Sequence, residues 1–171
     1  MTVMNSLSSM FTMNEEQKMR YRLATPDDIP EMCRLRTLQL IDEGEDEPVD
    51  VTAEMSDFFR RKMEDGSFVQ YMLEDDGKIV ATAGILFIEF TPGFHCRNGI
   101  RGYITDMYTA PEYRRRGIAT EMLGMLRDEA VSRKVERLML GASVHGMPVY
   151  RKFGFRDIDD WMYMDIEDLI V

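Results

Sequence analysis

The sequence predicts an α/β protein, a mixed β-sheet with helices on both of its faces. The first observation is a turn dipeptide, Asp76-Gly77, between two runs rich in β-forming residues, which indicates an antiparallel hairpin. The second is a strand, a long amphipathic helix and another strand over residues 102–140, which indicates a right-handed parallel crossover. Because one pairing is antiparallel and the other parallel, the sheet is mixed.

The chain is expected to begin with a short strand and a helix. Tyr21 and Leu23 alternate with arginines, as in a strand with one buried face. Thr25 then supplies a helix cap, and Pro26 takes the first helical position. This helix is predicted to bury a stripe of apolar residues at helical spacing: Ile29, Met32, Leu35, Leu38 and Ile41.

The rest of the chain alternates strands and helices. An acidic stretch over residues 42–50 ends the first helix, and a second helix runs from the cap Thr52 to Gly66. The later elements are the two hairpin strands, an irregular segment over 91–99, a strand over 102–109, a helix over 118–132, a strand over 136–142, a short helix ending at Gly154 and a last strand over 155–166. The predicted order is therefore β-α-α-β-β-β-α-β-α-β, without a repeat or a linker.

At 171 residues the chain has the length of one domain, which we place over residues 19–171. Residues 1–18 have neither the basic region nor the apolar core of a signal peptide, so a flexible leader is expected, with Met13 or Met19 as an alternative start. The sequence contains no run of about 18 apolar residues, so no membrane span is expected. The two cysteines and two histidines lack metal-ligand spacing, so we expect no metal and a cytoplasmic location.

The formal net charge is −10, from 31 acidic and 21 basic residues. Nucleic-acid binding needs a broad positive surface, so no nucleic-acid partner is expected. The same imbalance favours a cationic small molecule or peptide as the partner. The carboxylates between Asp42 and Glu47, followed by Asp50, either attract such a cation or form an ordinary solvated loop.

One stretch, "YTAPEYRRRGIATEML" over residues 108–123, concentrates three arginines at the start of a predicted helix in this acidic chain. The first amides of a helix lack internal acceptors, and the helix dipole makes this end partly positive. Gly117 lets the backbone approach an anion without a Cβ in the way. The pattern predicts an anion site. The spacing matches neither the nucleoside-triphosphate loop nor the dinucleotide fingerprint.

Two motifs in the second half of the chain resemble those of the Gcn5-related N-acetyltransferase (GNAT) superfamily. Residues 114–119, "RRRGIA", match the pyrophosphate-binding pattern [Q/R]-x-x-G-x-[G/A]. Residues 149–155, "VYRKFGF", contain the element Y-x-K-x-G-F about 30 residues later, after a helix and a strand. The order of elements is similar to that family from residue 20 to the end.

The resemblance implies acetyl-CoA as co-substrate and direct transfer to an amine within a ternary complex. It implies that the backbone of Met107, Tyr108 and Thr109 lies beside the pantetheine arm, with the Met107 amide polarising the acetyl carbonyl. The pyrophosphate would be held by the amides of residues 115–120, namely Arg115, Arg116, Gly117, Ile118, Ala119 and Thr120. A phosphate contact by the Arg114 or the Arg115 side chain stays open.

By the same resemblance Tyr150 would protonate the leaving thiolate, although its ring can instead anchor the helix. Ser143 stands where the family often has an asparagine that contacts the pantetheine, and His145 follows it closely. The candidates for the general base are Asp106, Glu89 and His95, and a water network without a single base is an alternative. Alternation along the strand places Asp106 on the face opposite Met107.

The preferred interpretation is an N-acetyltransferase that acts on the primary amine of a small molecule. One alternative is a CoA-binding sensor or interaction module without turnover, and another is a protein or peptide N-acetyltransferase. The apolar final segment, "WMYMDIEDLIV" over residues 161–171, also favours a homodimer.

Overall fold

The computed structural model describes residues 19–45, 49–158 and 162. In chain order its elements are β1 (Arg20–Leu23), the 3-10 turn η1 (Pro26–Asp28), α1 (Ile29–Asp42), α2 (Thr52–Glu64), β2 (Phe68–Asp75), β3 (Lys78–Glu89), β4 (Ile100–Thr109), the 3-10 turn η2 (Pro111–Tyr113), α3 (Ile118–Ser132), β5 (Arg137–Leu140) and α4 (Met147–Phe153). Among these residues, no helix has both the length and the apolar character needed to cross a bilayer.

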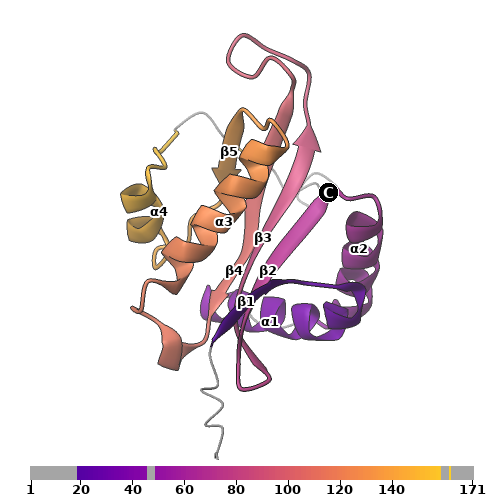
Figure 1. Cartoon of the computed structure of the whole chain (residues 1–171), viewed down its shortest axis with the longest axis vertical. Coiled ribbons are helices and arrows are strands. Elements are labelled where there is room, and N and C mark those ends of the chain that lie inside the picture. The colour runs from indigo at the N-terminus through magenta and orange to yellow at the C-terminus, as the bar shows by residue number, and fades with distance from the viewer. Residues whose placement is uncertain (1–18, 46–48, 159–161, 163–171) are drawn as a thin grey trace, which may run out of the picture.

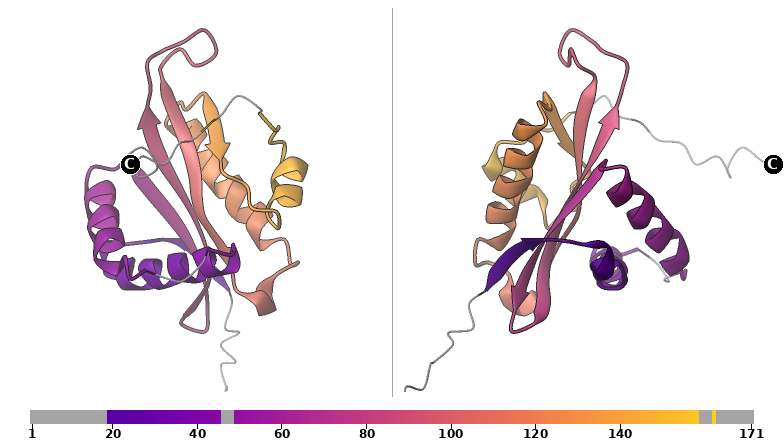
Figure 2. Two further views of the ribbon diagram at one scale, coloured as in Figure 1. Left: turned by 180° about the vertical axis from the view of Figure 1, so that it is seen from behind. Right: turned by 45° about the vertical axis from the view of Figure 1, so that its right-hand side comes forward.

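Within the described residues, five strands form one sheet in the order β1-β2-β3-β4-β5 (Figure 1). Neighbours from β1 to β4 are antiparallel, whereas β4 and β5 are parallel. The right-hand view of Figure 2 shows α1 and α2 against one face of the sheet and α3 and α4 against the other. The mixed sheet with helices on both faces, predicted from the sequence, is confirmed.

The turn between β2 and β3 explains why the hairpin was visible in the sequence. Asp76 and Gly77 have φ angles of 51° and 72°. Two successive positive φ angles give a turn whose twist matches that of the flanking strands, and Asp and Gly tolerate this conformation best.

Two apolar cores lie on the two faces of the sheet. On one face, α3 buries Met122, Leu123 and Leu126 completely against β3 and β4. On the other face, α1 and α2 pack against Phe68 and Met72 of β2. Burial of each such side chain contributes about 1.5–3 kcal/mol, so α1 and α3 have fixed positions relative to β4.

The predicted apolar stripe of α1 is wrong in its last turns. Met32 and Leu35 are buried as expected, but Ile41 is 50% exposed and Gln39 is only 7% exposed. The reason is that the end of α1 passes beneath a polar part of β4, described below, and not over the apolar core. A repeat of apolar residues cannot show where the layer underneath changes its chemistry.

The predicted last strand, over residues 155–166, is wrong in its first part. Residues 155–158 belong to no strand, and residues 159–161 and 163–166 lie outside the described residues. Arg151 of α4 forms an ion pair with Asp157, 3.0 Å between Nη2 and Oδ2. This contact places Asp157 beside α4.

Candidate functional site

β4 contains a bulge at the centre of the candidate site. Between residues 82 and 84 of β3 the pairing shifts, and two residues of β4, Asp106 and Met107, lie opposite one residue of β3. Asp106 has a φ of 53°, and the Thr82 hydroxyl donates to its carbonyl oxygen at 2.9 Å. Such a bulge bends the strand and redirects the side chains beside it.

Beyond the bulge, β4 and β5 separate. Residues 101–104 pair with residues 137–140, and β5 then ends while β4 continues to Thr109. Residues 105–109 therefore have no strand partner, within the described part of the chain, on the side of β4 where residues 101–104 pair with β5 (Figure 1). Backbone groups on an unpaired edge can hydrogen-bond an extended ligand. Met107, Tyr108 and Thr109, which were predicted to lie beside the pantetheine arm, belong to this edge.

The bulge turns the side chain of Asp106 away from the opening and towards α1. Asp106 is 5% exposed, and Arg36 of α1 lies 3.3 Å from its carboxylate, Nε to Oδ1. Gly84 makes room, because a Cβ there would lie 2.8 Å from the Phe68 ring and 3.3 Å from Asp106 Oδ2. Burial raises the pKa of Asp106 to about 6, and the charge of Arg36 limits the rise. Met107 packs on the opposite, α3 side, so the predicted opposition of these two residues is confirmed.

The other two base candidates lie apart from this position. Glu89 is exposed at the end of β3 and pairs with Ile100, at the far end of β4. At about 3.3 Å per residue, the five residues from Ile100 to Thr105 span about 17 Å. His95 is exposed in the loop beyond Glu89. The register of the hairpin explains the separation, which the order of residues alone does not show.

The chain between β4 and α3, residues 110–117, forms a loop that we name the anion loop. Arg115 has a φ of 62°, and Gly117 has a φ of 84° and caps α3. The buried side chain of Ile118 fixes the first turn of α3 to the core, while Thr120 is exposed. A Cβ at Gly117 would have no heavy atom within 4 Å, so this side of the residue is open. The first amides of α3 have no acceptor within the helix, and a helix start of this kind is suited to bind an anion.

The three arginines of the anion loop have different environments. Arg114 donates from Nε to the Thr109 carbonyl at 2.8 Å and forms an ion pair with Asp42 of α1. Arg116 donates to the Glu112 carbonyl at 2.8 Å and lies over the Tyr113 ring. Arg115 has no side-chain partner within the described residues. The structure therefore leaves Arg115 as the arginine available to a ligand.

Tyr150 lies on α4 with its ring half-buried. The ring packs edge-on against Phe155, 6.0 Å between centroids, and a Cβ at Gly146 would lie 2.7 Å from it. Burial, with smaller contributions from the charges of Glu43 and Tyr103, raises the pKa of the phenol to about 12. The phenol is therefore protonated at neutral pH and can donate a hydrogen bond.

Ser143 makes a contact that keeps the turn before α4 in place. Its hydroxyl accepts a hydrogen bond from the Gly146 amide at 3.1 Å, and its carbonyl accepts the amide of Met147 at 3.0 Å. The side chain is half-buried, whereas His145 is exposed. Ser143 thus has a local structural role of its own.

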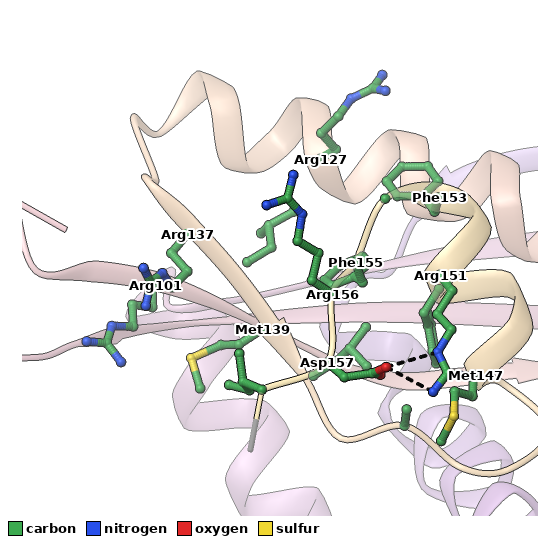
Figure 3. A pocket seen from close by; sticks show the side chains of 16 residues that line it. Arg101, Arg127, Arg137, Met139, Met147, Arg151, Phe153, Phe155, Arg156 and Asp157 are labelled. Carbon is green, nitrogen blue, oxygen red and sulfur yellow. Dashed lines mark hydrogen bonds and ion pairs between the residues drawn. The ribbon is translucent and has the colours of Figure 1, made fainter. Parts of the chain in front are cut away.

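A cavity of about 710 Å³ lies between β5, α4 and the segment after it (Figure 3). Its lining combines Tyr150 and Phe155 with five arginines, which are Arg101, Arg127, Arg137, Arg151 and Arg156. None of residues 105–120 lines it. The cavity therefore shares only Tyr150 with the groups near the bulge and the anion loop.

Comparison with models of known protein families identifies the family of this chain. The model of the acetyltransferase (GNAT) family matches residues 29–155, a span that contains the bulge, the anion loop and α4. The chain belongs to this family. The family resemblance inferred from the two motifs is confirmed.

Solved structures of other GNAT proteins are similar to this GNAT chain. A predicted acetyltransferase from Clostridium acetobutylicum, crystallised with acetyl-CoA, is 40% identical, with a TM-score of 0.86, over 88% of this chain and 98% of that one. A GCN5-related N-acetyltransferase from Ralstonia eutropha is 27% identical, with a TM-score of 0.77, over 87% and 99% of the two chains. Glucosamine-6-phosphate N-acetyltransferase from Arabidopsis thaliana, 19% identical with a TM-score of 0.67 over 86% and 98%, shares the fold. No curated protein matches the chain.

The structure also draws attention to three residues of this GNAT protein: Arg36 and Gln39, which the sequence alone did not point to, and Glu43, which was named only as part of the acidic stretch between Asp42 and Glu47. Arg36 of α1 forms the ion pair with Asp106 at the bulge. Further along the same helix, Gln39 Nε2 donates a hydrogen bond to Glu43 Oε1 at 3.0 Å. The sequence held one signal, since these positions share one helix face at spacings of three, four and seven.

Proposed function

We propose that the protein transfers the acetyl group of acetyl-CoA to the primary amine of a small molecule, directly and within a ternary complex. The observation that carries this proposal is the continuity of the bulged, unpaired edge of β4 with the open anion loop. An extended thioester ligand with a diphosphate at one end has the complementary shape and charge. The Clostridium relative crystallised with acetyl-CoA supports this donor.

The residues that would hold the donor belong to two neighbouring segments. The amides at the start of α3, together with Arg115, would bind the diphosphate, because oriented amides and a free guanidinium both favour an anion. The edge at residues 107–109 would bind the pantetheine amides. The fit is supported by the glycine at the N-cap of α3, because without a Cβ at Gly117 the backbone can closely approach a diphosphate.

The proposed chemistry is a proton-balanced acyl transfer. Bound acetyl-CoA supplies the activated acetyl group. Asp106, directly or through water, accepts the proton that the acceptor ammonium must lose, and its pKa of about 6 leaves it ionised at neutral pH. The Met107 amide donates to the acetyl oxygen as charge develops there. Tyr150 gives its proton to the departing thiolate and regains one, directly or through water, from the nitrogen as the amide forms, so that a C–N bond replaces the C–S bond and CoA leaves as the thiol.

An acceptor panel tests the proposal. Release of free CoA is followed with diamines, polyamines, aminoglycosides and peptides with free N-termini. We expect turnover with small amines. Tight CoA binding without turnover on any acceptor would favour a sensor module, and turnover confined to peptides would favour a protein N-acetyltransferase. Absence of CoA binding would refute the proposal.

We further propose a cytoplasmic, homodimeric protein without a nucleic-acid or membrane partner. Cys33 and Cys96 are free and buried, which supports a reducing location. The net charge of −10 supports the absence of nucleic acid. Most of the segment expected at the dimer interface, residues 161–171, lies outside the described residues, and light scattering of the full chain tests the dimer.

A further inference from the structure

Tyr103 of β4 lies on the face of the sheet that α1 and α2 cover. It pairs with Leu86 of β3, and side chains directly opposite each other in an antiparallel pair point to the same face. Leu86 packs against the core that α1 and α2 form, so the Tyr103 side chain points to that face. The next residue, Ile104, belongs to the core under α3, as the alternation of a strand requires.

The hydroxyl of Tyr103 lies where β4 and β5 separate. Ile104 and Leu140 form the last pair between the two strands, and Gly141 follows β5 directly. A Cβ at Gly141 would lie 3.4 Å from the Tyr103 hydroxyl oxygen. Because residues 105–109 continue β4 without a partner on this side, the phenol stands at the inner end of the opening between the two strands.

This hydroxyl is free to contact a group that enters the opening. Tyr103 is half-buried, and its hydroxyl has no hydrogen-bond partner among the described residues. Other tyrosines of the chain are engaged: Tyr21 donates to Glu121 at 2.5 Å. In the same way, Tyr113 donates to Asp75 at 2.7 Å. A phenol that the protein leaves unpaired can donate one hydrogen bond to a ligand and accept another from it.

The proposed chemistry requires a hydrogen-bond acceptor for the reacting nitrogen on this face. Tyr103 precedes Asp106 by three residues, about 10 Å along an extended strand, and both side chains lie on the α1 and α2 face. The nitrogen keeps N–H bonds after it has lost one proton to Asp106, and an N–H group shielded from water needs an acceptor. The contribution of Tyr103 to the raised pKa of Tyr150 agrees with a phenol close to the reacting groups.

We propose that the Tyr103 hydroxyl binds the reacting nitrogen of the acceptor by accepting a hydrogen bond from its N–H group. The inference rests on the proposed function, because it assigns a further residue to that same site. Tyr103 thereby holds the nitrogen at the inner end of the opening, between the acetyl group and Asp106. Since every amine acceptor has this nitrogen, the contact is independent of the rest of the acceptor.

The kinetic test uses Tyr103→Phe, which removes the hydroxyl and keeps the ring. We expect kcat/KM to fall by about tenfold, because an N–H group loses its acceptor, for each of 1,4-diaminobutane, spermidine and kanamycin that the wild type acetylates. The affinity for CoA and the melting temperature should not change. Tyr71→Phe is the matched control, since that half-buried phenol lies on β2 against the α3 core, on the opposite face. Unchanged kcat/KM in Tyr103→Phe, or a loss confined to one amine, would overturn the contact with the nitrogen.

Two ligands give a readout without turnover. One carries an N-butylacetamide group on the sulfur of CoA, so that an amide N–H takes the place of the reacting nitrogen. The other carries the corresponding butyl ester, which has an oxygen at that place and no N–H. In calorimetric titration, Tyr103→Phe should bind the amide about tenfold more weakly than the wild type does, and the ester with little change.

The outcomes separate this inference from the proposed function. An equal loss of affinity for the amide and the ester, or no loss for either, would overturn the role of Tyr103. Acetylation of amines by the wild type would then leave the proposed function standing. A wild type that binds no CoA, or that acetylates no amine, would instead refute the proposed function itself.

Discussion

Around Gly117 the candidate site consists of backbone amides from consecutive residues, whereas around Asp106 it consists of side chains that tertiary contacts bring together. The ion pair between Asp42 and Arg114, which joins the two regions, links residues 72 positions apart in the sequence. The first region depends on the conformation of one short segment. The second depends on how α1 crosses β4.

This difference has a consequence for substitution. Most side chains of the anion loop can change without loss of its amides, and Gly117 is the exception because its φ of 84° disfavours any other residue. Near Asp106 each function depends on one side chain, so that a single substitution changes the chemistry. The family can therefore share a donor site while each member has its own acceptor.

The largest effect is expected for Gly117→Glu. A carboxylate in front of α3 repels a diphosphate, and CoA binding weakens by more than about 100-fold. Gly117→Gln has the same shape and the same backbone strain of about 1–2 kcal/mol without the charge, and should lose about tenfold or less. Both variants should stay folded because no heavy atom lies within 4 Å of the new Cβ. Calorimetry with CoA measures binding, and thermal melting measures the stability of the fold. An equal weakening of CoA binding in both variants would contradict an anion site.

Tyr150→Phe sharpens the distinction between binding and chemistry. Loss of the acid slows kcat by about 100-fold, whereas KM for acetyl-CoA changes little. The phenol has a pKa of about 12, so its role should persist up to alkaline pH. Tyr71→Phe, in a half-buried position of β2, serves as the control and should leave kcat unchanged. A rise in KM larger than the fall in kcat would assign the ring to anchoring.

Asp106→Asn tests the side-chain half of the site through its pH dependence. Asp106 must be ionised to accept a proton, and its folded pKa is raised from 3.8 to about 6 by burial. Wild-type kcat should therefore fall as the pH falls through about 6. The variant should lose this pH dependence, and its kcat at pH 8 should be about 20-fold lower than that of the wild type. Arg36 and Glu43 are the charged groups that act on this carboxylate. If kcat of the variant still falls at low pH as in the wild type, a water network and not Asp106 accepts the proton.

The smallest effect is expected for Arg115→Ala. Its exposed guanidinium adds one ion pair to the amides, so CoA binding should weaken by about fivefold at low salt and less at high salt. Arg116→Ala is the matched control, because that side chain already binds the Glu112 carbonyl. Calorimetry at two ionic strengths measures the difference, and a larger loss in Arg116→Ala would reverse the assignment.

Prediction from the sequence succeeded where the information is local. The turn at Asp76 and Gly77 and the glycine cap of α3 follow from backbone preferences that neighbouring residues determine. It failed where the outcome depends on distant partners. Ile41 was expected inside because of its spacing, and Glu89 was grouped with Asp106 because both belong to strands near the predicted opening.

By itself the sequence determined the family and the order of the elements up to α4, since helix starts, turns and glycine conformations are encoded over a few residues. The anion site before α3 stays a prediction. Only the tertiary structure decided that Asp106 turns towards Arg36, that Arg115 is the free arginine and that the Tyr103 hydroxyl lies where β4 and β5 separate. The charge state and availability of a side chain depend on its burial and on its neighbours in space, and these neighbours come from segments that the chain brings together only when it folds.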